Sequence, residues 1–225
     1  MGGEGKGEGI ATVASRGVRA SAIAAVRGWA ARAVARLAIG VALLGGIGIA
    51  QAAPVEREGM RYEDTARIDG SRVVLNGVGV RGGGLFKGYV AGLYLPEKES
   101  DAGQVLASKG AKRIAVRMLL GVNGELLAKT FGDGIRKNYP DAALDPLRER
   151  VDAFDAQVRA VGGVAKGDAI DLDYTPAGGT RLVVNGKRRG DAIPGDDFYA
   201  ALLKMFIGER AVDKGLRAAL LGQAP

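Results

Sequence analysis

The glycine-rich stretch at residues 75–96, LNGVGVRGGGLFKGYVAGLYLP, constrains the fold more than any other part of the chain. It contains a formal G-x-G-x-x-G at residues 77–82, which in a dinucleotide-binding turn would open an amphipathic helix. Instead, two more glycines follow, and then a run of aromatic and branched residues without a 3.6-residue apolar stripe. The pattern predicts two long strands, residues 72–80 and 85–95, joined by a flexible bend that carries Arg81.

The first 52 residues differ in composition from the rest. They carry six basic and two acidic residues, then an uncharged apolar run at residues 37–50, and then the small-x-small triplet Ala50-Gln51-Ala52. This order is typical of a secretory signal. The apolar run has 14 residues, fewer than the roughly 20 that a membrane-spanning helix needs. We therefore expect residues 1–52 to be a leader and residues 53–225 one domain, which is periplasmic or secreted after cleavage near Ala52. Retention of the leader as an anchor is the alternative.

Composition excludes several kinds of chemistry. The chain has no cysteine and no histidine, which removes disulfides, Ser-His-Asp and Cys-His catalysis and histidine-based metal sites. After residue 52 there are 26 basic and 23 acidic residues, a net charge of +3, and no basic stripe interleaved with aromatics. We therefore expect no nucleic-acid partner and no cofactor. The oligomeric state does not follow from the sequence.

The remaining patterns alternate between strands and helices. Two hairpin turns, at residues 176–179 and 185–186, imply antiparallel pairing. The chain therefore belongs to the α+β class, with an antiparallel sheet wrapped by helices. Expected strands are residues 62–68, 112–120, 170–175 and 180–184; expected helices are residues 101–108, 123–138 and 146–161, one capped by Asp196 or Asp197, and one capped by Asp213.

A cluster of acids in the first hairpin allows two interpretations. Asp168, Asp171 and Asp173 have a spacing compatible with metal ligation. However, Asp171 and Asp173 alternate with apolar residues along the predicted strand, which places them on its polar face. We therefore expect a solvated face rather than a metal site.

Three segments carry a resemblance to a known family. LNGVGVRGGGLFKGYVAGLYL, the hairpin KGDAIDLDYTPAGGT with its following NG, and FYAALLKMFIGERAVDKGLRAALLG resemble the chalcone isomerase-like superfamily, and more narrowly its exported bacterial members. The likeness extends over nearly all of residues 53–225. It implies an open-faced β-sandwich, with a ligand cleft between the long strands and the helices.

The resemblance also implies site residues. The plant isomerases of the family use an arginine, a threonine, a tyrosine and a late serine or threonine, and only the arginine matches here, as Arg81. The other positions fall on Tyr89, on or beside Leu119, and on Met205. Fatty-acid-binding plant relatives instead hold the acyl carboxylate with an arginine and a tyrosine at the places of Arg81 and Tyr89.

Two functions from different classes therefore follow. The first is a non-catalytic, exported module that binds a fatty acid or a similar amphipathic carboxylate. In it Arg81 and Tyr89 hold the carboxylate, because a guanidinium and a phenol together suit one carboxylate. Leu119 and Met205 line the apolar tail pocket. The alternative is an isomerase of the intramolecular lyase type that acts with altered residues. A partner-binding accessory protein is a third possibility.

Overall fold

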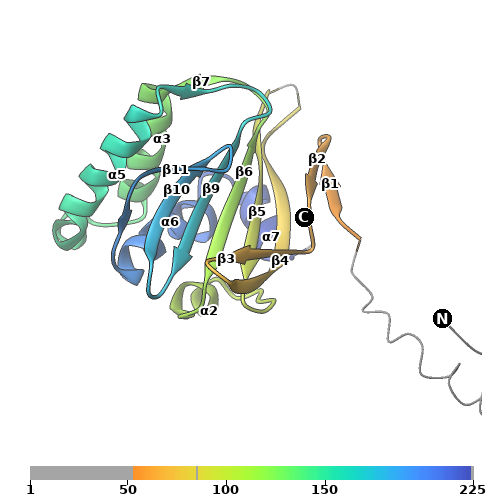
Figure 1. Ribbon diagram of the computed structural model, residues 1–225, viewed down its shortest axis with the longest axis horizontal. Coiled ribbons are helices and arrows are strands. Elements are labelled where there is room, and N and C mark those ends of the chain that lie inside the picture. Colours follow the sequence, from red (N-terminus) through yellow and green to blue (C-terminus); the bar gives the residue numbers. More distant parts are fainter. Residues whose placement is uncertain (1–52, 85, 224–225) are drawn as a thin grey trace, which may run out of the picture. The chain divides into compact units, whose positions relative to one another are not determined.

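The computed structural model describes residues 53–84 and 86–223. The predicted leader, residues 1–52, lies outside this part. The described residues form an antiparallel sheet of seven strands in the order β11-β10-β9-β6-β5-β4-β3 (Figure 1). Its strands are β3 (Thr65–Ile68), β4 (Ser71–Gly83), β5 (Phe86–Leu95), β6 (Lys112–Met118), β9 (Ala169–Thr175), β10 (Gly179–Val184) and β11 (Lys187–Ile193). This confirms the α+β class and the antiparallel sheet.

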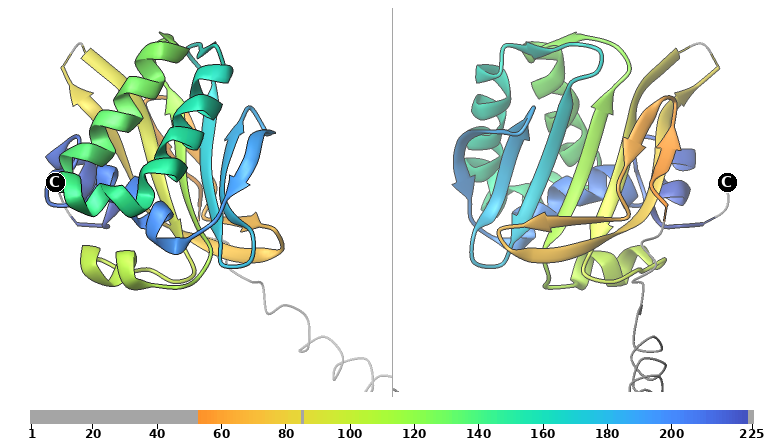
Figure 2. Two further views of the ribbon diagram at one scale, coloured as in Figure 1. Left: turned by 90° about the vertical axis from the view of Figure 1, so that its left-hand side faces the viewer. Right: turned by 45° about the vertical axis from the view of Figure 1, so that its right-hand side comes forward.

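Helices cover one face of this sheet, as both figures of the domain show (Figures 1 and 2). They are α2 (Ala102–Ala107), α3 (Gly124–Lys137), α4 (Asp141–Leu144), a 3-10 turn η1 (Asp145–Leu147), α5 (Arg148–Ala160), α6 (Asp196–Ile207) and α7 (Lys214–Leu220). Asn123 and Asp213 cap α3 and α7 through their side chains, as predicted. The predicted cap of α6 was wrong. Gly195 holds that position, and the Asp197 carboxylate instead pairs with Arg150, at 2.6 and 2.8 Å.

Short strands cover part of the opposite face. β1 (Val55–Arg57) and β2 (Met60–Tyr62) form a hairpin that the sequence analysis did not foresee, and the strand predicted at residues 62–68 is divided between β2 and β3. Tyr62 is buried, and its hydroxyl donates to the carbonyl oxygen of Val90 at 2.9 Å. A Cβ at position 92 would lie 2.7 Å from the Tyr62 ring, so the ring fits against β5 only because residue 92 is glycine. Two further short strands, β7 (Val122–Asn123) and β8 (Gly163–Val164), pair with each other.

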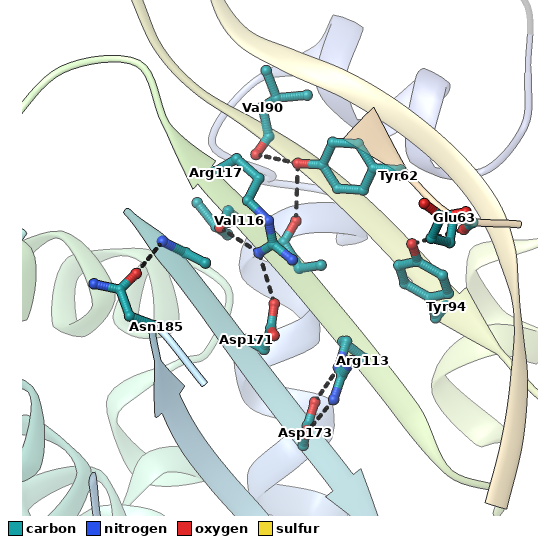
Figure 3. Close-up of polar contacts among 12 residues, drawn as sticks. Tyr62, Glu63, Val90, Tyr94, Arg113, Val116, Arg117, Asp171, Asp173 and Asn185 are labelled. Carbon is teal, nitrogen blue, oxygen red and sulfur yellow. Dashed lines mark hydrogen bonds and ion pairs between the residues drawn. The ribbon is translucent and has the colours of Figure 1, made fainter. Parts of the chain in front are cut away.

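The acidic face of β9 is not solvated, contrary to the prediction. Arg113 pairs with Asp173 through two contacts of 2.5 and 2.7 Å, and Arg117 pairs with Asp171 at 2.8 Å (Figure 3). Only 10% of the Asp173 side chain and 15% of the Asp171 side chain are exposed. The Arg117 guanidinium also lies 5.7 Å from the centre of the Tyr62 ring. The face is therefore covered and its charges are paired.

Among the described residues, the buried hydrophobic side chains lie between Tyr62 and Leu221. Residues 53–223 therefore contain a hydrophobic core and both faces of its sheet, which is what a chain needs to fold on its own. Within this described part, no helix combines the length and the apolar character that a membrane span requires.

Candidate functional site

A cavity of about 270 Å³ lies between the sheet and the helices. Strands β4, β5, β6 and β9 form one side, and α3 and α6 form the other. Its lining is mostly apolar, as in typical small-molecule sites. The lining residues are Arg81, Gly88, Tyr89, Val116, Met118, Leu120, Val122, Leu126, Leu127, Thr130, Phe131, Ile170, Met205 and Phe206.

Arg81 and Tyr89 are cross-strand neighbours. The pairing of β4 with β5 places them directly opposite each other, so their side chains share one face of the sheet. Both line the cavity. Arg81 belongs to β4 rather than to a bend, because the strand continues to Gly83. The sequence prediction of a shared cleft is therefore right for this pair, although the bend begins later than expected.

Tyr89 carries a buried hydroxyl group that has no hydrogen-bond partner among the residues the structure describes. The residue is 9% exposed, and its oxygen has no hydrogen-bond partner within the described ranges. A buried polar group left unpaired costs about 1–3 kcal/mol, and such groups are rare in native proteins. Burial raises the pKa of Tyr89 well above its ordinary value, against an opposing effect of the Arg81 charge. The phenol is therefore a neutral hydrogen-bond donor at physiological pH.

Arg81 lies at the exposed edge of the cavity. Its guanidinium makes no hydrogen bond and no ion pair with residues 53–84 or 86–223. Its charge acts electrostatically on the carboxylate of Asp213. Asp213 accepts hydrogen bonds from the backbone N–H groups of Gly82 (3.1 Å) and Leu216 (2.9 Å). Burial would raise the pKa of Asp213, but these hydrogen bonds and the charge of Arg81 together lower it.

Asp213 therefore fixes the end of β4 beside the site. The sequence analysis identified it as a helix cap but missed this second role. The sequence shows the capping role because a cap depends on residues close to it in the chain. It does not show the hydrogen bond from Gly82, because this bond joins residues 131 positions apart.

Met205 lines the cavity as predicted, from helix α6. A Cβ at position 134 would lie 2.6 Å from the Met205 sulfur, so Gly134 of α3 leaves the space that this side chain fills. Leu119 was predicted to line the cavity too, and this prediction was wrong. Its side chain packs against a hydrophobic cluster that includes Tyr62 and Val90, on the other face of the sheet.

The prediction for Leu119 is wrong by one position in the sequence. Neighbouring residues of a strand point to opposite faces. Met118 and Leu120, on either side of Leu119, contribute to the cavity instead. The other apolar lining residues of α3, β7 and β9 were also not predicted as site residues.

No metal site is apparent in the part of the chain that the structure describes, where no three acidic side chains gather. The Asp168 carboxylate accepts hydrogen bonds from the Ala165 N–H and from the Asn185 amide. Asp171 and Asp173 are paired with arginines. The hydrogen bonds of Asp168 lower its pKa. All three acids of the predicted cluster therefore have structural partners.

Comparison with known proteins identifies the class to which this domain belongs. The chalcone isomerase-like family matches residues 54–222, and the chain belongs to that family. The structure is similar to the crystal structure of a fatty-acid binding protein of Arabidopsis thaliana, with a TM-score of 0.59 and 17% identity. That match covers 75% of this chain and 96% of the plant protein. At this identity the likeness concerns the fold. No curated protein matches the chain in sequence.

Proposed function

We propose that this protein binds a fatty acid or a similar amphipathic carboxylate in the cavity, without catalysis. The observation that carries the proposal is the buried Tyr89 hydroxyl, which has no partner among the described residues and lines the same cavity as the unpaired Arg81. A carboxylate in the cavity would accept from both groups, because a guanidinium and a neutral phenol are both donors. The apolar walls suit an acyl chain.

Binding is favoured over catalysis by the titratable groups of the cavity. Among its lining residues only Arg81 and Tyr89 can titrate. An efficient general acid or base has a pKa near the working pH. Burial moves the pKa of Tyr89 away from that range. Thr130 adds a hydroxyl, but this donates to the Leu126 carbonyl at 2.7 Å. The fatty-acid binding activity named for the Arabidopsis structure agrees with this proposal.

Replacing Arg81 tests the proposal directly. A hydrogen bond to a charged group contributes about 1.5–3 kcal/mol. We therefore expect Arg81→Ala to weaken binding of dodecanoate roughly 10- to 150-fold, at about 1.4 kcal/mol per decade. The measurement is displacement of a fluorescent fatty acid, with a thermal melt alongside. Arg72→Ala is the matched control, because Arg72 is an exposed arginine of the same strand that does not line the cavity.

Unchanged affinity in Arg81→Ala would contradict the proposal. A large drop in melting temperature with unchanged affinity would show that Arg81 has a structural role instead.

We also propose that the protein is exported and is an exported bacterial member of the family. The support is the order of basic residues, apolar run and Ala50-Gln51-Ala52. N-terminal sequencing of the protein from its host is expected to begin at or near Ala53. An intact Met1 on cytoplasmic protein would contradict both the cleavage and the location.

A further inference from the structure

Three exposed hydrophobic side chains lie at one end of the domain. Phe86 is 86% exposed, Leu126 51% and Leu120 43%. Among the described residues the only other exposed large hydrophobic side chain is Val55, at 40%. Figures 1 and 2 show the tip of the β4–β5 hairpin, the end of β6 and the start of α3 at this same end. We call Phe86, Leu120 and Leu126 the apolar rim.

The apolar rim borders the cavity. Leu120 and Leu126 belong to both, because each lines the cavity and is exposed. The Leu119 N–H donates to the Gly88 carbonyl at 3.0 Å, which holds the segment with Leu120 against β5. Gly88 lines the cavity, and Phe86 begins the same strand two residues earlier. Two of the exposed apolar side chains, Leu120 and Leu126, therefore line the cavity, and the third, Phe86, lies on the strand that carries the lining residue Gly88.

One cation near the rim, Arg81, makes no ion pair with the described residues. Lys87, next to Phe86, pairs with Glu58 at 2.8 Å. The Asp213 carboxylate accepts from two backbone N–H groups. Arg81 has no ion pair within residues 53–84 and 86–223. An exposed guanidinium beside apolar groups is the combination that interfacial membrane anchors present to phospholipid headgroups.

The size of the rim favours a lipid bilayer over a protein partner. A stable protein interface buries about 800 Å² on each side, and three side chains, of which only Phe86 is largely exposed, offer much less. Interfacial anchors, in contrast, bury their apolar side chains only about 5–10 Å into the boundary between headgroups and acyl chains. Trp, Phe and Leu are typical of the side chains that such anchors bury. A single protruding aromatic at a hairpin tip suits such shallow insertion.

We infer that the apolar rim is a docking surface for a lipid bilayer, with Phe86 as the inserting side chain. Docking here turns the cavity entrance toward the acyl layer. Membrane docking goes beyond the proposed function. It rests on the proposed function only in one respect, the identity of the ligand that would pass between membrane and cavity. The two can fail separately, since docking requires no ligand in the cavity.

The chain offers a specific probe for this test. Trp29 is the only tryptophan, so the chain from Ala53 onward contains none. Phe86→Trp in this chain introduces one indole at the proposed insertion point. With phosphatidylcholine vesicles that carry brominated acyl chains, we expect a blue shift and strong quenching of its emission. Val55→Trp is the matched control, because Val55 is the one exposed large hydrophobic residue outside the rim in the described part of the chain. Its emission is expected to stay unquenched.

A second variant measures the contribution of the side chain. Phe86→Ser is expected to lower the vesicle partition coefficient of the same chain roughly tenfold, as for the loss of one inserted aromatic side chain. Its affinity for dodecanoate is expected to stay the same, which separates docking from the binding proposed for the cavity. Equal quenching at both indole positions, or unchanged partition of Phe86→Ser, would overturn the inference. A dimer that forms without vesicles and is lost in Phe86→Ser would also overturn it, in favour of a second copy of the chain.

Discussion

The two faces of the sheet use the same residue types in opposite ways. On the face covered by β1 and β2, the Tyr62 hydroxyl donates to Val90, and Arg113 and Arg117 are paired with aspartates (Figure 3). On the face covered by the helices, the Tyr89 hydroxyl has no partner within the described chain, and Arg81 has no ion pair there. Each face thus combines tyrosine and arginine, but within the described chain Tyr89 and Arg81 lack the hydrogen-bond and ion-pair partners that Tyr62, Arg113 and Arg117 have.

This difference separates structure from function. Satisfied polar groups hold strands together, whereas an unsatisfied buried donor costs about 1–3 kcal/mol of stability. Proteins keep such costs mainly at functional sites, and a ligand at the site can remove them. The comparison therefore predicts that equivalent substitutions on the two faces change the stability of the ligand-free protein in opposite directions.

Arg113→Ala is expected to cause the largest change in the free energy of unfolding. It leaves the Asp173 carboxylate, whose side chain is 10% exposed, without its bidentate partner. Removing one member of a buried ion pair typically costs about 3–5 kcal/mol. We expect a loss of roughly 3 kcal/mol in the free energy of unfolding, measured by urea denaturation. Exposed Arg72→Ala should change it by less than about 0.5 kcal/mol. Similar stabilities of the two variants would show that the Arg113–Asp173 pair is not a structural element.

Much of the fold could be predicted from local patterns. The alternation of Ile170, Leu172 and Tyr174, the hairpin turns and the caps Asn123 and Asp213 depend on neighbours in sequence, and the structure confirms each of them. The covered state of Asp171 and Asp173 could not be predicted in this way. Alternation identifies a polar face, but not whether a distant segment such as the one with Tyr62 folds over it.

The candidate site was predictable only in part. The family resemblance predicts that Arg81 and Tyr89 hold one carboxylate, and the strand register shows that the two residues are neighbours. The prediction for Leu119 failed because a shift of one residue along a strand moves a side chain to the opposite face of the sheet. The capping role of Asp213 was visible in the sequence, but its bond to Gly82 depends on how α7 packs against β4.

Tyr62→Phe is expected to lower the free energy of unfolding, as Arg113→Ala does, but by less. It removes the bond to the Val90 carbonyl but keeps the ring against Gly92. Loss of one buried hydrogen bond costs about 0.5–1.5 kcal/mol, and we expect about 1 kcal/mol in urea denaturation. Tyr94→Phe is the comparison on β5, since its hydroxyl donates to the partly buried Glu63 carbonyl at 2.9 Å. A gain of stability in Tyr62→Phe would break the proposed contrast between the faces.

Tyr89→Phe is expected to change the free energy of unfolding least of the three variants. It is expected to raise this free energy, whereas Arg113→Ala and Tyr62→Phe lower it. It removes a buried hydroxyl that has no partner in the described structure and keeps the ring in the core. Without ligand, the variant should be more stable than the wild type by about 0.5–1 kcal/mol, because the cost of the unpaired donor disappears while the lost packing contacts of the oxygen offset part of the gain. Saturating dodecanoate should reverse this order. A ligand stabilises the folded state by RT ln(1 + [L]/Kd), and the wild type, with one more donor to the carboxylate, has the lower Kd.

Urea denaturation of both proteins, with and without dodecanoate, measures this reversal. Tyr94→Phe should show none, because its hydroxyl lies outside the cavity. A loss of stability in ligand-free Tyr89→Phe, together with unchanged affinity, would mean that this hydroxyl serves the fold in the same way as that of Tyr62.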